Sequence, residues 1–138
     1  MRNMTNCRAR LLGKKDLKAV FKTLRIKDGI GDDEIKPDEF SYWYNKNRDG
    51  TIGNYIIYEV IDSEPSHRAD DKVFGREFYA QIDVFSIRSF ESKELSDFLV
   101  RLEEKLTEYL FEVEMQGEEY EQDTRLYRQT LYVSKIYF

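Results

Sequence analysis

The sequence is poor in the residues that several kinds of site require. Its 138 residues include one cysteine, one histidine, one tryptophan and two prolines. Cys7 alone cannot form a disulfide within the chain, and one histidine with one cysteine is too few for the usual zinc spacings. No run approaches the ~20 consecutive apolar residues of a membrane span, and the first residues lack the pattern of a secretory signal. We therefore expect a soluble protein that folds in the cytoplasm and has no membrane partner.

The composition is that of a folded globular domain. Apolar residues make up 41% of the chain, aromatic residues 14% and charged residues 36%, which excludes a disordered tail. A chain of this length can bury a core of its own without disulfides or metals. We therefore expect a single domain over residues 1–138.

Charge is distributed unevenly along the chain. Residues 1–27 contain nine lysines and arginines and one acid, Asp16, whereas the rest contains thirteen basic and twenty-six acidic residues. One interpretation is a basic helix or arm that reaches an acidic partner or nucleic acid. The other is a helix with a solvated basic face that complements an acidic body. The acidic body argues against tight wrapping of DNA, because phosphate contacts dominate that affinity.

Apolar periodicity predicts two helices and four strands. A helix is expected over residues 8–26, where Leu17, Val20, Phe21 and Leu24 recur at helical spacing, and a second over residues 92–110. The predicted strands span residues 54–61, 72–87, 111–115 and 125–138. Turn-forming residues predict a long loop over 27–53 and a polar connection over 62–71.

This order of elements predicts an α+β fold. We expect a sheet of about four strands, mostly antiparallel or mixed, because two hairpin-like pairs flank one helix. The N-terminal helix and the long amphipathic helix 92–110 should pack on one face of that sheet.

Candidate catalytic residues are few and scattered. His67 lies in a segment rich in turn formers. A nucleophilic site would also need a correctly placed serine or cysteine and an orienting acid, and no G-x-S-x-G or similar elbow occurs, so a solvated loop histidine is the simpler interpretation. Asp83, Glu91 and Lys93 are the residue types of a metal-dependent nuclease. However, Glu91 and Lys93 open the predicted helix, where the helix dipole explains an early acid. We expect no catalytic residues.

Metal and cofactor motifs are likewise weak. Residues 45–52 imitate the start of a calcium-binding EF-hand loop, but Ile56 stands where the closing glutamate is required, so a turn is expected. The acidic residues between 112 and 123 lack metal-ligand spacing, and no phosphate-binding glycine motif occurs. We expect no cofactor and no metal.

Aromatic residues suggest protein interfaces. Tyr42, Trp43 and Tyr44 lie in the predicted long loop, and Tyr132 and Tyr137 lie on the last predicted strand, which is apolar on both sides. Tyrosine suits interfaces because its ring is apolar and its tip is polar. The alternative is that these rings complete the core.

A charged segment offers a second candidate contact. Arg68, Asp70, Asp71 and Lys72 lie close together in the connection before the second predicted strand. Charged short loops can set the register between neighbouring subunits. A plain solvated turn is the alternative interpretation.

Four segments resemble a known family. Residues 54–61, 69–72, 79–85 and 123–127, together with the amphipathic helix between them, resemble the tail-completion proteins of long-tailed bacteriophages, which include tail terminators and head-to-tail joining proteins. The resemblance covers about residues 54–138. The basic residues 1–27 and the loop 27–53 depart from the family pattern, so their roles stay open.

The resemblance implies a non-enzymatic structural subunit of the virion tail, assembled in the bacterial cytoplasm. It implies a homo-oligomeric ring of about six copies, closed by a rotational axis. The ring would cap the head-proximal end of the tail tube, contact the tail-tube protein and a head-completion or connector protein, and pass DNA through its lumen. Two alternatives remain: another tail-tube, connector or adaptor protein, and, more distantly, a metal-dependent nuclease.

Overall fold

The computed structural model describes residues 3–27, 32–34, 42–46 and 52–138. The elements, in chain order, are α1 (Asn6–Lys22), β1 (Arg25–Lys27), β2 (Asp32–Glu34), β3 (Tyr42–Lys46), β4 (Ile52–Ala69), β5 (Lys72–Ser86), α2 (Lys93–Glu108), β6 (Glu112–Met115), β7 (Glu119–Glu121) and β8 (Leu126–Tyr137). Within these residues, no helix has the length and apolar character needed to cross a membrane.

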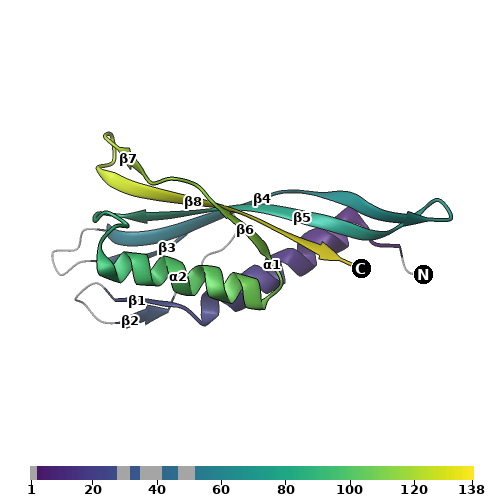
Figure 1. The fold of residues 1–138 in the computed structure, drawn as a ribbon, viewed down its shortest axis with the longest axis horizontal. Coiled ribbons are helices and arrows are strands. Elements are labelled where there is room, and N and C mark those ends of the chain that lie inside the picture. Colours follow the sequence, from purple (N-terminus) through teal and green to yellow (C-terminus); the bar gives the residue numbers. More distant parts are fainter. Residues whose placement is uncertain (1–2, 28–31, 35–41, 47–51) are drawn as a thin grey trace.

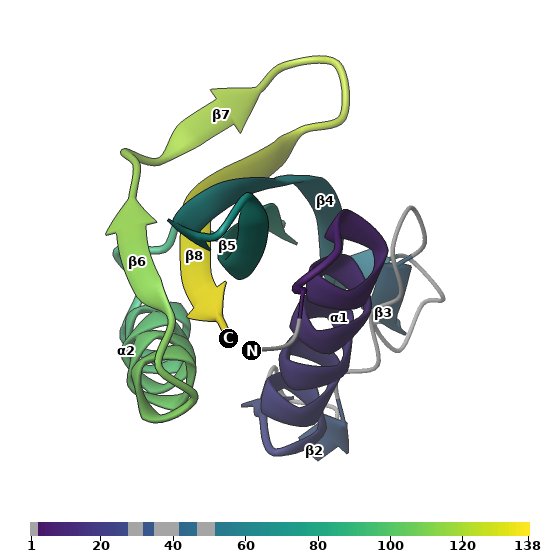
Figure 2. The same cartoon turned by 90° about the vertical axis from the view of Figure 1, so that its right-hand side faces the viewer.

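A six-stranded sheet forms the body of the molecule (Figure 1). Its strand order is β3-β4-β5-β8-β6. Strand β7 pairs with residues 126–128 of β8, and β6 with residues 131–134 of the same strand. Every pairing is antiparallel. The strands β1 and β2 form a separate two-stranded ribbon. Both helices lie on the same side of the large sheet, and within the described residues no helix covers its other face (Figures 1 and 2).

Alternation along the strands separates the two faces. On β5, Phe78, Ala80, Ile82 and Val84 are fully buried beneath the helices, whereas the intervening residues are only half-buried. Successive strand residues point to opposite faces, so one face enters the core and the other meets solvent.

Helix α1 is anchored by its apolar stripe. Leu17, Val20 and Phe21 are buried, and the helix contacts β4, β5 and β8. Thr5 caps the helix, because its hydroxyl accepts a hydrogen bond from the backbone N–H of Arg8 at 3.1 Å. Gly13 brings the helix backbone against the ring of Phe78, leaving no room for a side chain.

Helix α2 buries Leu95, Phe98, Leu102 and Leu106 at the spacing expected of one helical face. The helix ends with Leu110 in a left-handed conformation (φ 68°), and the N–H of Phe111 donates to the carbonyl of Leu106 at 3.0 Å. This six-to-one hydrogen bond is the usual C-terminal cap of a helix and directs the chain into β6.

The predicted α+β fold, with an N-terminal helix and a long amphipathic helix on one face of an antiparallel sheet, is confirmed. The sheet has six strands where about four were expected. Several local predictions were wrong: β4 continues to Ala69 where a connection over 62–71 was expected, the first helix ends at Lys22 rather than at residue 26, and strands occur at residues 25–27, 32–34 and 42–46 where the end of that helix and a loop were expected. The remainder of the predicted loop lies largely outside the described residues.

Candidate functional site

The uncovered face of the sheet is strongly acidic. The register of strands β4, β5, β8 and β6 aligns the side chains of this face in four rows. The rows are Ile57, Asp83 and Thr130; Glu59, Gln81, Tyr132 and Glu114; Tyr79, Ser134 and Glu112; and Glu64, Glu77 and Ile136. These four rows contain no lysine or arginine; Arg128 lies on the same face in the next row beyond Asp83 and Thr130, where it forms ion pairs with Glu119 and Glu121. We call Glu59, Glu64, Glu77, Asp83, Glu112 and Glu114, with Tyr79, Tyr132 and Ile136, the acidic sheet face.

The pKa of Tyr79, at the middle of this face, responds to the negative charge around it. Partial desolvation raises the pKa of its phenol, and the neighbouring carboxylates of Glu77, Glu64 and Glu112 raise it further. Three carboxylates from three different strands therefore act on one phenol. The face favours positive charge from a partner, because such charge relieves this mutual repulsion.

A hollow of about 280 Å³ opens at the end of the acidic sheet face. It is lined by Glu77, Leu110, Glu112, Ser134, Lys135 and Ile136. The ammonium group of Lys135 is engaged by Asp16 at 2.8 Å. The hollow therefore combines two carboxylates with the exposed apolar side chains of Leu110 and Ile136. This combination suits the apolar stem and charged tip of a lysine or arginine side chain.

Asp83 is held within the sheet. The hydroxyl of Thr130 donates to one carboxylate oxygen at 2.6 Å, and the amide of Gln81 donates to the other at 3.0 Å. Glu91 and Lys93 lie at the start of α2, which packs on the other side of the sheet. The structure therefore does not bring these three nuclease candidates together, and no group of three possible metal ligands occurs within residues 3–27, 32–34, 42–46 and 52–138.

The outer side of α1 carries the opposite charge. Arg8, Lys15 and Lys22 are exposed on it, and Leu11, 68% exposed, lies between the first two. These residues point away from the sheet because the buried stripe of the same helix contacts it. We call these four residues the basic helix face; it lies on the opposite side of the molecule from the acidic sheet face (Figure 1).

Strands β4 and β5 extend beyond the body as a two-stranded arm that ends in a tight hairpin (Figure 1). Ala69 pairs with Lys72, and the two turn residues have positive φ angles, 50° at Asp70 and 61° at Asp71. Two consecutive residues of this kind make the turn that matches the twist of antiparallel strands. Arg68 and Lys72 thus end strands rather than lie in a flexible loop, and the four predicted contact residues surround the tip of the arm.

The first residues of the chain brace the arm close to its tip. The N–H of Met4 donates to the carbonyl of Val73 at 2.6 Å, and the guanidinium of Arg76 donates to the carbonyl of Met4 at 2.9 Å. His67, expected to be a solvated histidine, instead packs beside the rings of Phe74 and Phe138 at centroid distances of 5.6 and 5.0 Å. Its position on a strand against two aromatic rings makes it part of the packing of the arm.

The two tyrosines predicted on the last strand have different roles. Tyr132 is 40% exposed and lies at the centre of the acidic sheet face. Tyr137 is not available to a partner, because it is 9% exposed and its hydroxyl donates to Asp16 at 2.6 Å. Tyr42, Trp43 and Tyr44 form most of β3 at the edge of the sheet, but their side chains lie outside the described part of the chain.

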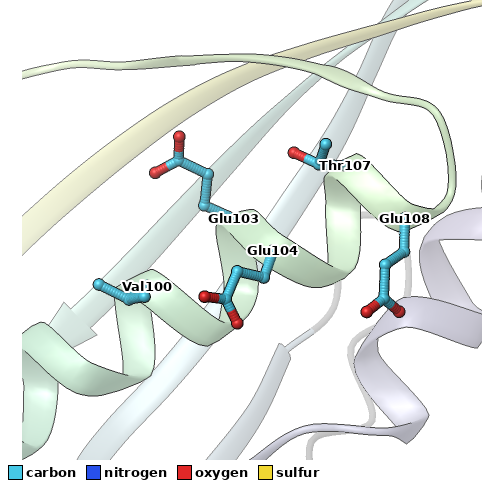
Figure 3. Close-up of a pocket in the computed structure, with 5 residues that line it drawn as sticks. All are labelled: Val100, Glu103, Glu104, Thr107 and Glu108. Atoms are coloured by element: carbon cyan, nitrogen blue, oxygen red, sulfur yellow. The ribbon is translucent and has the colours of Figure 1, made fainter.

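A second hollow, of about 460 Å³, lies along the outer side of α2 (Figure 3). Its lining, within the described residues, is Val100, Glu103, Glu104, Thr107 and Glu108. These side chains all come from one helix, and the carboxylate of Glu108 is paired with the ammonium of Lys105 at 3.1 Å. The arrangement is an acidic surface rather than a set of groups that converge on a reacting atom.

The acidic sheet face was missed in the sequence because its residues are far apart along the chain. Alternating acids on residues 112 and 114 and on 77 and 83 were signals, but only the pairing of β5 with β4 and β8 places them together. Comparisons of the chain with protein-family models, curated proteins and solved structures find no match.

Proposed function

We propose that this chain is a non-catalytic assembly subunit, which associates with further copies and with other proteins in the tail of a long-tailed bacteriophage. The observation that carries the proposal is the acidic sheet face. A sheet face that its own helices leave uncovered, and that combines carboxylates with tyrosine and isoleucine, is typical of a surface that another protein contacts.

The resemblance to tail-completion proteins supports the same function. Residues 54–61 lie in β4, residues 79–85 in β5, and residues 123–127 lead into β8. These strands are neighbours in the sheet and carry most of the acidic sheet face. The segments that resemble the family are therefore also the segments that build the candidate interaction surface.

In this proposal, a ring of about six copies caps the head-proximal end of the tail tube. The ring contacts the tail-tube protein on one side and a head-completion or connector protein on the other, in the virion tail. DNA passes through its lumen without binding. The acidic outer side of α2, with Glu103, Glu104 and Glu108, suits a lumen lining because like charge repels phosphate (Figure 3).

Deleting the gene in the phage that encodes it tests the proposal. We expect tails of abnormal length, or tails that do not join heads, when particles are imaged by negative-stain electron microscopy. A wild-type copy supplied in trans should restore normal particles. Normal-length, head-joined tails in the deletion strain would end the proposal.

A further inference from the structure

The two charged surfaces of this molecule fit one another in size. From Arg8 to Lys22 the basic helix face is ~21 Å long at 1.5 Å per residue. The acidic sheet face extends ~20 Å along β5, from Glu77 to Asp83, and ~14 Å across the strands from β4 to β6. A single helix therefore covers most of this face.

The two surfaces also match in chemistry. Leu11 is exposed between Arg8 and Lys15 on the helix, and Tyr132 and Ile136 are exposed among the carboxylates of the sheet. Each surface thus presents an apolar centre with charges around it, of opposite sign on the two sides. This is the pattern by which charge complementarity fixes the register of a contact with an apolar centre.

One molecule cannot join these surfaces to each other, because they lie on opposite sides of it (Figures 1 and 2). A second copy can. We infer that the basic helix face of one copy docks on the acidic sheet face of the next, with a basic side chain of the helix in the hollow between Glu77 and Glu112. The contact joins two different surfaces, so it repeats from copy to copy and closes into a ring where the rotation allows.

This inference rests on the self-association in the proposed function and adds which surfaces meet. The footprint of one helix is small compared with the ~800 Å² that each partner buries in a stable complex. A single contact is therefore weak. Closing the ring, or binding to the end of a tail tube, adds further contacts and so stabilises the assembly. Because the contact is largely electrostatic, added salt weakens it.

Charge reversal on each surface tests the inference. We expect E77K/E112K to reduce self-association at least tenfold in sedimentation velocity over a concentration series at low salt, and K15E/K22E to do the same. The first variant carries two positive surfaces and the second carries two negative ones. An equimolar mixture should recover association, because each surface then meets one of opposite charge.

E103K/E104K is the matched control. It makes the same charge change as E77K/E112K on the outer side of α2, and it should associate as the wild-type protein does. Unchanged circular dichroism and melting temperature establish that each variant is folded. Three results would each overturn the inference: unimpaired association of both reversed variants, failure of their mixture to associate, and a wild-type protein that stays monomeric throughout. None of these decides the tail proposal, which the gene deletion tests separately.

Discussion

Asp16 shows how one residue links the parts of this molecule. It is the single acid among residues 1–27, and it lies on α1. Its carboxylate accepts hydrogen bonds from the ammonium of Lys135 at 2.8 Å and from the hydroxyl of Tyr137 at 2.6 Å. Asp16 therefore fastens the first helix to the last strand.

We expect Tyr137→Phe to lower the free energy of unfolding by about 1.5–3 kcal/mol at neutral pH, because a hydrogen bond to a charged group is lost. Burial and the Asp16 carboxylate raise the pKa of Tyr137 above its ordinary value of 10.0. A raised pKa gives stability that is complete below the unfolded-state value and declines as the pH rises toward the folded-state value.

The wild-type protein should therefore lose stability above about pH 10 by up to ~1.4 kcal/mol per pH unit from this group. The Tyr137→Phe variant lacks that contribution, so the difference in free energy of unfolding between the wild-type protein and the variant should shrink as the pH rises. Urea unfolding at neutral pH and above pH 10 measures this. Tyr120→Phe, at an exposed tyrosine, is the control. A difference in free energy of unfolding that stays constant with pH would contradict a hydrogen bond from Tyr137 to Asp16.

Gly13 makes a second prediction at the scale of the residue. A Cβ atom there would lie 2.4 Å from carbon atoms of the buried Phe78 ring. Gly13→Ala should therefore cost about 1–3 kcal/mol of overpacking, which outweighs the ~1 kcal/mol that alanine adds to helix propensity. Thermal or urea unfolding measures the difference. Gly117→Ala is the control, since nothing lies within 4 Å of its added Cβ; a stabilised Gly13→Ala protein would show that α1 does not pack closely on β5.

At the scale of the element, the long β4–β5 hairpin carries like charges directly across from each other. Glu64 pairs with Glu77, and neither has a cation in its row of the acidic sheet face. Opposed like charges destabilise a strand pair. The hairpin therefore retains an unfavourable pair that a cationic partner could relieve.

Glu64→Lys should raise the free energy of unfolding of the monomer by about 0.2–1 kcal/mol, because it replaces a repulsive pair with an attractive one. Glu59→Lys is a matched control, since its partner across the strands is the neutral Gln81. Chemical denaturation at low and high salt measures both, and the gain should shrink at high salt. An equal gain in free energy of unfolding from the two substitutions would mean that the charge of the whole face, and not the Glu64–Glu77 pair, determines the stabilisation.

At the scale of the whole molecule, charge separation is the main property. The outer side of α1 is basic, whereas the sheet face away from the helices and the outer side of α2 are acidic; the core between helices and sheet is closed by apolar side chains from both. The arm of β4 and β5 projects beyond this body, and the first residues of the chain brace it (Figure 1). Separation of charge on opposite sides favours association in one direction.

Arg76→Ala should release the first residues from the arm, because Arg76 donates to the carbonyls of Met4 at 2.9 Å and Ser63 at 3.3 Å. We expect faster hydrogen exchange at the amide of Met4, which donates to Val73, and a loss of about 1.5–3 kcal/mol in the free energy of unfolding. Arg68→Ala is the control, because Arg68 is exposed on the other strand of the arm. Equal exchange in the two variants would show that Arg76 does not brace the arm.

The sequence by itself determined the two helices, the main strands and most of the core. Leu95, Phe98, Leu102 and Leu106 recur at 3.6-residue spacing, and Phe78, Ala80, Ile82 and Val84 alternate. These signals are local, so they need no knowledge of the neighbours. The charge difference between residues 1–27 and the rest could be read in the same way.

Only the tertiary structure decided what lies on the surface. Tyr132 and Tyr137 are five residues apart on one strand, and the odd spacing places the first on the uncovered face and the second against Asp16. The acidic sheet face gathers residues from β4, β5, β6 and β8, and strand register brings them together. Register depends on long-range pairing, which local patterns do not contain, because the same alternation fits several partners until the core selects one.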